Sequence, residues 1–107
     1  MRKGILTIAI GKKFNKMAKY LALSCIINNP SLPRAIITDN ADYIKGFFDI
    51  IIEYEKEMGN PFNLKLKMIQ YTPFYETLFL DADTLVYNNL DFYWEYFNSQ
   101  SIIYIIN

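Results

Sequence analysis

Short apolar runs alternate with helical patterns of apolar residues along the chain. Such alternation is typical of βα units, in which helices pack against a mainly parallel sheet. The apolar runs predict strands at residues 5–10, 35–38, 49–54, 77–80 and 101–107. Helical spacing predicts helices at residues 14–28, 42–48, 62–71 and 90–97. The pattern therefore indicates an α/β fold in a single domain, residues 1–107, without an internal repeat or a dividing linker.

Two of the predicted helices have a clear apolar face, which we expect to pack against the sheet. In the first helix this face comprises Phe14, Met17, Ala18, Leu21 and Cys25, and in the last helix it comprises Leu90, Tyr93, Trp94 and Phe97. Cys25 is the only cysteine, and its place on the first face predicts a core position instead of a disulfide or a redox role. The charged stretch 55–60, which contains Gly59, is predicted to be the most mobile loop.

Acidic and basic residues balance, with 11 of each, so the net charge offers no global argument for a nucleic acid or an anionic membrane as a partner. The distribution is uneven, because no acid precedes Asp39 and no basic residue follows Lys67. For the lysines near the start of the first helix we expect a solvated helix face, with phosphate contact as the alternative. These residues are Lys12, Lys13, Lys16 and Lys19.

The chain has no apolar run of the roughly 20 residues that a membrane-spanning helix requires. The apolar part of residues 1–7 is too short for a signal peptide, so we expect a cytoplasmic protein. The chain also lacks histidine, the commonest general base and a frequent ligand of transition metals. Any metal site in this sequence is therefore expected to use oxygen ligands.

The chain is rich in aromatic residues, with nine tyrosines and a single tryptophan, Trp94. Most of them fall at positions of an apolar face, which predicts that they pack in the core. Stacking against a sugar is the alternative for Tyr71 and Tyr87.

The most informative feature is the pair Asp81 and Asp83, which directly follows the predicted strand 77–80. In open α/β sheets, ligands bind beyond the carboxyl ends of the strands. Two carboxylates one residue apart on an extended chain point to the same side, so both can offer oxygen ligands to one hard cation such as Mg²⁺ or Mn²⁺. A diphosphate could bridge to that metal. The alternative is a solvated loop, because a bare Asp-x-Asp pair is a weak motif.

The order of the predicted elements and the residues around Asp81 carry a resemblance to a known family. The chain offers a strand with Gly11 at its end, a long helix and a strand that ends at Thr38. The segment 66–69 precedes residues 73–84, which read Pro-Phe-Tyr-Glu-Thr-Leu-Phe-Leu-Asp-Ala-Asp-Thr. Together these features resemble the N-terminal half of nucleotide-diphospho-sugar glycosyltransferases of the GT-A fold. Glycosyltransferase family 8, which includes glycogenin-like and bacterial galactosyltransferase members, is the most similar.

The resemblance implies a Rossmann-like GT-A fold and a D-x-D motif that binds Mn²⁺ or Mg²⁺. Through the metal, the motif would bind the diphosphate of a nucleotide-sugar donor, with a UDP-sugar as the first expectation. By resemblance Asp83 is a metal ligand, and Asp81 binds the metal or the ribose of the donor. The other residues expected against the base and phosphates of the donor are Ile10, Gly11, Lys13 and Lys67. The acceptor and the catalytic residue stay unassigned.

The sequence departs from this family in two ways. Relatives commonly complete the metal site with a histidine well downstream, and they build the acceptor pocket there. This chain has no histidine and stops about one helix and one strand after the aspartates. We therefore expect a truncated or fragmentary glycosyltransferase, with association through an open sheet edge. A donor-binding or interaction remnant without catalysis is the alternative.

A second class of enzyme also uses a strand that ends in Asp-x-Asp. In haloacid-dehalogenase-like phosphatases the first carboxylate is the nucleophile and the second is the acid and base, over Mg²⁺. That pattern requires threonine at the fourth position after the first aspartate, where this chain has Leu85. The motif also lies late in this chain instead of on the first strand, so the phosphatase is the weaker hypothesis.

Overall fold

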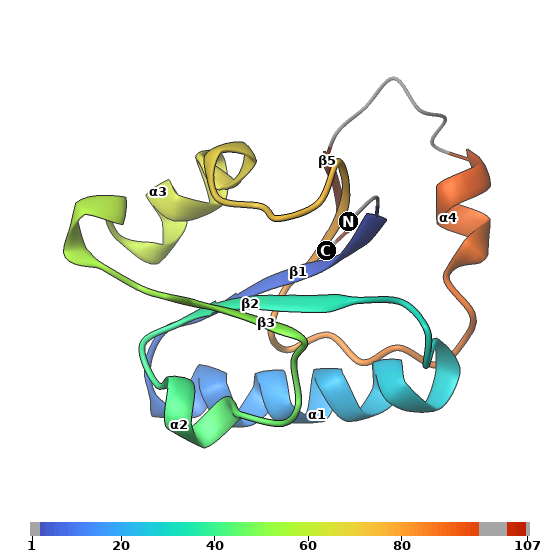
Figure 1. The fold of residues 1–107 in the computed structure, drawn as a ribbon, viewed down its shortest axis with the longest axis horizontal. Helices are drawn as coiled ribbons and strands as arrows, with labels where there is room; N and C mark the ends of the chain where they lie inside the picture. Colours follow the sequence, from blue (N-terminus) through green and yellow to red (C-terminus); the bar gives the residue numbers. More distant parts are fainter. Residues whose placement is uncertain (1–2, 97–102, 107) are drawn as a thin grey trace.

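A computed structural model describes residues 3–96 and 103–106 and shows one parallel sheet of five strands between helices (Figure 1). The strands are β1 (Lys3–Ala9), β2 (Arg34–Thr38), β3 (Ile50–Glu53), β4 (Glu76–Leu80) and β5 (Ile103–Ile106). Their order across the sheet is β3-β2-β1-β4-β5. The order matches the 3-2-1-4-5 arrangement of Rossmann-like sheets, in which ligands bind where the order reverses.

Helices cover both faces of the sheet (Figure 1). The helical elements are α1 (Lys12–Asn28), α2 (Ala41–Ile44), α3 (Pro61–Leu66) and α4 (Asp91–Tyr96), with two 3₁₀ turns, η1 (Lys56–Met58) and η2 (Met68–Gln70). The helices α1 and α2 lie on one face, and α3 with the 3₁₀ turns lies on the other. Leu90 and Trp94, at α4, pack with Leu21 and Cys25 of α1.

The central strand, β1, shows why the sheet is apolar on both faces. Its successive side chains point to opposite faces, as in any strand. Ile5 packs with the α1 side of the core, whereas Leu6 packs with Leu64 of α3 and with Phe79. Both faces of a parallel sheet are covered by helices, so its strands are near-continuous apolar runs instead of alternating ones. The buried strand β2 follows the same rule.

The predicted α/β fold with a parallel sheet and flanking helices is confirmed, and the strand bounds differ from the prediction by only a few residues. Two helical segments are shorter than predicted. The segment 42–48 holds only the single turn of α2, and 62–71 divides into α3 and η2. The predicted loop 55–60 contains η1, and Met58 in it is buried.

The positions of the aromatic residues correct one prediction. Trp94 is buried, as expected, but Tyr20, Tyr43, Tyr75 and Tyr87 are among the exposed large side chains of the described residues. Core packing is therefore the wrong interpretation for these four tyrosines. Phe97 of the predicted last helix, and Ser101, Ile102 and Asn107 of the predicted last strand, lie outside the described residues.

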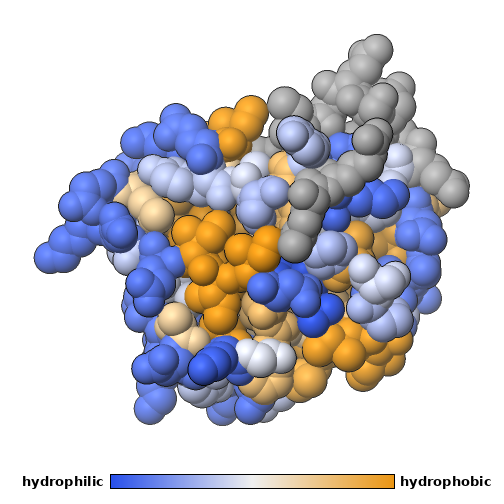
Figure 2. Space-filling model, viewed as in Figure 1, coloured by the Kyte–Doolittle hydropathy of each residue, from blue (hydrophilic) through white to orange (hydrophobic). Residues whose placement is uncertain are grey.

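The surface in the orientation of Figure 1 is mostly hydrophilic, with hydrophobic areas near its middle and at its lower right (Figure 2). Within the described residues, no helix combines the length and the apolar character that crossing a lipid bilayer requires.

Candidate functional site

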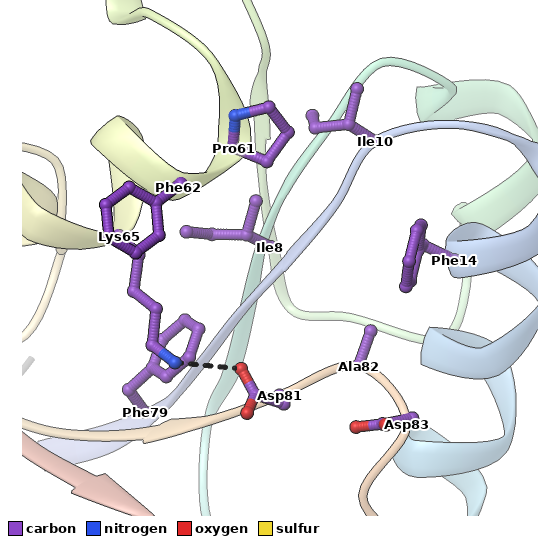
Figure 3. A pocket seen from close by; sticks show the side chains of 10 residues that line it. All are labelled: Ile8, Ile10, Phe14, Pro61, Phe62, Lys65, Phe79, Asp81, Ala82 and Asp83. Carbon is purple, nitrogen blue, oxygen red and sulfur yellow. Dashed lines mark hydrogen bonds and ion pairs between the residues drawn. The ribbon is translucent and has the colours of Figure 1, made fainter. Parts of the chain in front are cut away.

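Three charged residues line a cavity beyond the carboxyl ends of β1 and β4. In the sheet, β2 is the neighbour of β1 on one side and β4 is its neighbour on the other. The connection from β1 to β2 contains α1, which covers one face of the sheet, and α3, which precedes β4, covers the opposite face. The cavity therefore lies at the point where the strand order reverses, which is the usual ligand site of such sheets. It measures about 300 Å³ and is lined by Ile8, Ile10, Phe14, Pro61, Phe62, Lys65, Phe79, Asp81, Ala82 and Asp83 (Figure 3).

Two aromatic side chains from different helices stand on opposite sides of this cavity (Figure 3). Phe62 comes from α3 and Phe14 comes from α1. Both are substantially exposed, at 70% and 47% of their surface. The helical pattern assigned Phe14 to the core, and the structure corrects this position, because the first turn of α1 extends past the end of the sheet to the cavity.

Asp81 and Asp83 line the same cavity, but they are not on an extended strand. The strand β4 ends at Leu80, and the N–H of Thr84 donates to the carbonyl of Asp81 at 2.9 Å, which closes a turn. Between the two carboxylates, Ala82 is buried in the cluster that includes Ala9 and Ala18. The small buried methyl group anchors the turn against α1, so the flanking carboxylates both reach the cavity.

Lys65 is the basic residue of the cavity, and the sequence pattern missed it. Its Nζ lies 3.3 Å from Oδ1 of Asp81 and 5.2 Å from the centre of the Phe79 ring. Lys67, which the resemblance placed near the donor, is exposed at the C-terminal cap of α3 and is outside the cavity lining. The buried pair Leu64 and Met68 marks the inner face of this segment, but Lys65 and Lys67 flank that face equally, so the sequence did not distinguish them.

The three residues predicted at the end of β1 have different positions. Ile10 lines the cavity. Gly11 is outside the lining, with a φ of +97°, and its N–H donates to both carboxylate oxygens of Asp39 at 3.1 Å. Lys13 is exposed, and its Nζ lies 6.0 Å from the centre of the Phe14 ring at the edge of the cavity. Of the three, only Ile10 has a side chain in the lining.

A buried amide holds this corner of the fold together. Asn15 is 1% exposed, and its Nδ2 donates to the carbonyls of Ala9 and Gly11 at 3.2 and 2.9 Å and to Oδ1 of Asp39 at 3.0 Å. Its Oδ1 accepts a hydrogen bond from the hydroxyl of Thr38. Asn15 therefore joins the ends of β1 and β2 to the start of α1, and the apolar pattern of the helix gave no sign of it.

The residues present fit a divalent cation only if a ligand completes the site. The described residues contain no group of three or more histidine, cysteine or acidic side chains that could hold a metal. The cavity supplies two carboxylates, Asp81 and Asp83. Mg²⁺ is typically bound by one or two carboxylates together with substrate phosphates and water, so this pair suits a metal that arrives with a phosphorylated ligand.

Cys25 lies away from the cavity and has no part in this chemistry. It is 1% exposed in the core between α1 and the sheet. Burial raises the pKa of its thiol to about 11, against opposing contributions from Arg34 and from a hydrogen bond with Ser24. Its burial in this cluster confirms the predicted core position.

The two tyrosines with a sugar-stacking alternative lie in different places. Tyr71 is half-buried against the core on the α3 face. Tyr87 is 76% exposed and lines a second cavity of about 420 Å³, which is formed by residues 84–90, 92 and 93 with Leu80. Only Tyr87 therefore has an accessible ring beside a cavity.

No family model and no curated protein sequence matches the chain.

Proposed function

We propose that the chain is the donor-binding half of a GT-A glycosyltransferase similar to family 8, and that it binds a nucleotide-diphospho-sugar in the cavity beyond β1 and β4. One observation carries the proposal: Lys65, Asp81 and Asp83 line a single cavity at the reversal of the strand order. Two carboxylates and one lysine beside apolar walls suit a ligand that has both a charged diphosphate and a flat nucleobase.

The charged end of the cavity would bind the diphosphate. Asp81 and Asp83 would hold Mn²⁺ or Mg²⁺, and the phosphate oxygens would supply further ligands. When bound, the cation stabilises the negative charge of the departing nucleoside diphosphate. Lys65 adds a positive charge beside the same phosphates and exchanges its contact with Asp81 for one with the ligand.

The apolar part of the cavity would bind the nucleoside. Phe14 and Phe62 face the space from opposite sides, and Ile8 and Ile10 of the β1 segment form its inner wall. Aromatic rings stack on nucleobases without distinguishing them strongly, so this wall supports nucleotide binding without naming the base. UDP-sugars are the first donors to test, and the sugar acceptor and the catalytic residue stay unassigned.

Calorimetry with the purified chain tests the proposal. We expect heat of binding with UDP or a UDP- or GDP-sugar in Mn²⁺, and loss of that heat in EDTA. Asp83→Asn should weaken metal-dependent binding at least about tenfold, because one of two carboxylate ligands is lost. Asp42→Asn, which changes an exposed acid on α2, is the matched control and should bind as the parent does.

Two results would contradict the proposal. The first is a folded chain that binds none of these nucleotides with or without metal. The second is an Asp83→Asn variant with unchanged affinity. Binding without transfer to any sugar acceptor would support the donor site and favour the remnant without catalysis.

A further inference from the structure

The helix α1 has an outer face on which basic and apolar side chains are separated along the axis. The outer face consists of Lys12, Lys13 and Lys16 in its first half and Tyr20, Leu23 and Ile27 in its second half. All six are exposed, and Ile27 is exposed over 78% of its surface. At about 100° per residue, all six fall within an arc of about 100°, opposite the buried side chains such as Leu21 and Cys25.

The basic half of this face has an unbalanced positive charge. The helix Lys12–Asn28 contains no acidic residue. The ion pairs among the described residues include Arg34 with Asp49 and Lys65 with Asp81, and none of them involves a lysine of α1. Two exposed acids lie near this face. Asp39 accepts from the N–H of Gly11 at the start of α1, and Asp42 of α2 is followed by Lys45, so the lysines still outnumber the acids. The charge is therefore available to an anionic partner.

The apolar half of this face is extended by a neighbouring segment of the chain, residues 85–87. Val86 donates its N–H to Oγ of Ser24 at 2.9 Å, and its carbonyl accepts from Nδ2 of Asn28 at 2.7 Å. These bonds hold the segment beside α1, and the residues that flank Val86, Leu85 and Tyr87, are both exposed. In Figure 2 the lower right, where α1 ends and this segment passes, is hydrophobic.

From this arrangement we propose that the outer face of α1 binds the surface of an anionic phospholipid bilayer. Lysines beside anionic headgroups gain from the surface potential, and the exposed tyrosine, leucine and isoleucine can enter the interfacial layer. The face is about 22 Å long from Lys12 to Ile27, so both halves reach one flat surface. A nucleic acid would match the lysines but would leave the apolar half exposed. The proposal does not rest on nucleotide binding.

Vesicle co-sedimentation tests this inference with the whole chain. We expect binding to vesicles made of equal parts phosphatidylcholine and phosphatidylglycerol, little binding to phosphatidylcholine alone, and weaker binding as salt rises. Lys16→Glu should weaken binding at least about fivefold, given the attraction of one lysine to an anionic surface. Lys56→Glu, at an exposed lysine in η1 on the other side of the sheet, is the matched control and should bind as the parent does.

The apolar half needs its own pair of variants. Ile27→Ser should weaken binding to anionic vesicles, whereas Ile69→Ser, at an exposed isoleucine of η2, should not. Circular dichroism checks that each variant is folded. The proposal is overturned if the folded chain does not bind anionic vesicles, or if the two isoleucine variants bind equally. It is also overturned if duplex DNA binds more tightly than vesicles and Ile27→Ser leaves that binding unchanged.

Discussion

The ammonium nitrogen of Lys65 lies 3.3 Å from a carboxylate oxygen of Asp81, so an ion pair joins α3 to the turn after β4. The two side chains are 29% and 38% exposed. Partly exposed pairs of this kind contribute at most about 1 kcal/mol to stability, because solvent screens them. The pair can therefore be opened by a ligand at little cost to the fold, which is what a phosphate-binding lysine requires.

Replacing Lys65 by glutamine should separate ligand binding from stability. We expect UDP affinity in Mn²⁺ to fall about tenfold, since a charged hydrogen bond to phosphate is lost, while the free energy of unfolding changes by less than about 1 kcal/mol. Calorimetry and urea unfolding measure the two effects. Lys56→Gln is the control, because this exposed lysine is outside the cavity lining. If Lys67→Gln weakens binding and Lys65→Gln does not, the residue suggested by the resemblance is the correct one.

Replacing Asn15 by alanine should destabilise the fold by about 1–3 kcal/mol, because it removes the partners of buried polar groups. Those groups include the carbonyl of Ala9 and the hydroxyl of Thr38. Urea unfolding followed by circular dichroism measures the change. Asn63→Ala, at an exposed position of α3, should change stability by less than about 0.5 kcal/mol. Equal stability of the two variants would show that the buried network is dispensable.

Replacing Gly4 by alanine should cost about 1–3 kcal/mol of stability through overpacking. A Cβ at Gly4 would clash with the ring of Phe74, which packs in the α3-side core. The control is a double-mutant cycle with Phe74→Leu, measured by thermal or urea unfolding. If the clash is the cause, Gly4→Ala should cost less in the Phe74→Leu background than in the parent. Additive effects would contradict a direct contact.

Because the thiol of Cys25 is buried, we expect the free energy of unfolding to decrease at alkaline pH. Its pKa is raised to about 11 in the folded chain, so the folded state keeps its proton where the unfolded state, with a pKa near 9, has lost it. Between these two pKa values the unfolded state binds fewer protons than the folded state. The protonated thiol therefore contributes its full stabilisation below about pH 9, and this stabilisation is lost as the pH rises to about 11. Comparing the pH profiles of the parent and Cys25→Ala isolates the effect, since the two chains share every other titratable group. Parallel profiles would refute it.

Local patterns predicted a large part of the fold. The apolar runs at β1, β2, β3 and β4 are strands within a few residues of the predicted bounds, because a strand buried on both faces must be apolar throughout. The helix α1 was also predicted, since a helix packed on a sheet shows its period in the chain. The predicted length failed for α2, where the chain after one helical turn reaches Gly46 with a φ of +94°.

The sequence predicted only some of the residues of the candidate site. Asp81 and Asp83 follow an apolar strand, and that local order was sufficient to single them out. Lys65 was missed, and Lys67 was chosen instead, because the two differ by only two positions in a segment whose helix ends at Leu66. Which of them faces the cavity depends on how α3 packs against Phe79 and Leu6, and those partners are far away in the sequence.

The sequence by itself determined the strands, the first helix, the parallel α/β class and the acidic pair, because burial and strand ends produce patterns among neighbouring residues. Only the tertiary structure decided which side chains share a cavity, since Phe14, Lys65 and Asp83 come from separate elements. It also revealed that Asn15 is buried among polar partners. These relationships are contacts between distant segments, and a local pattern of apolar and polar residues carries no information about them.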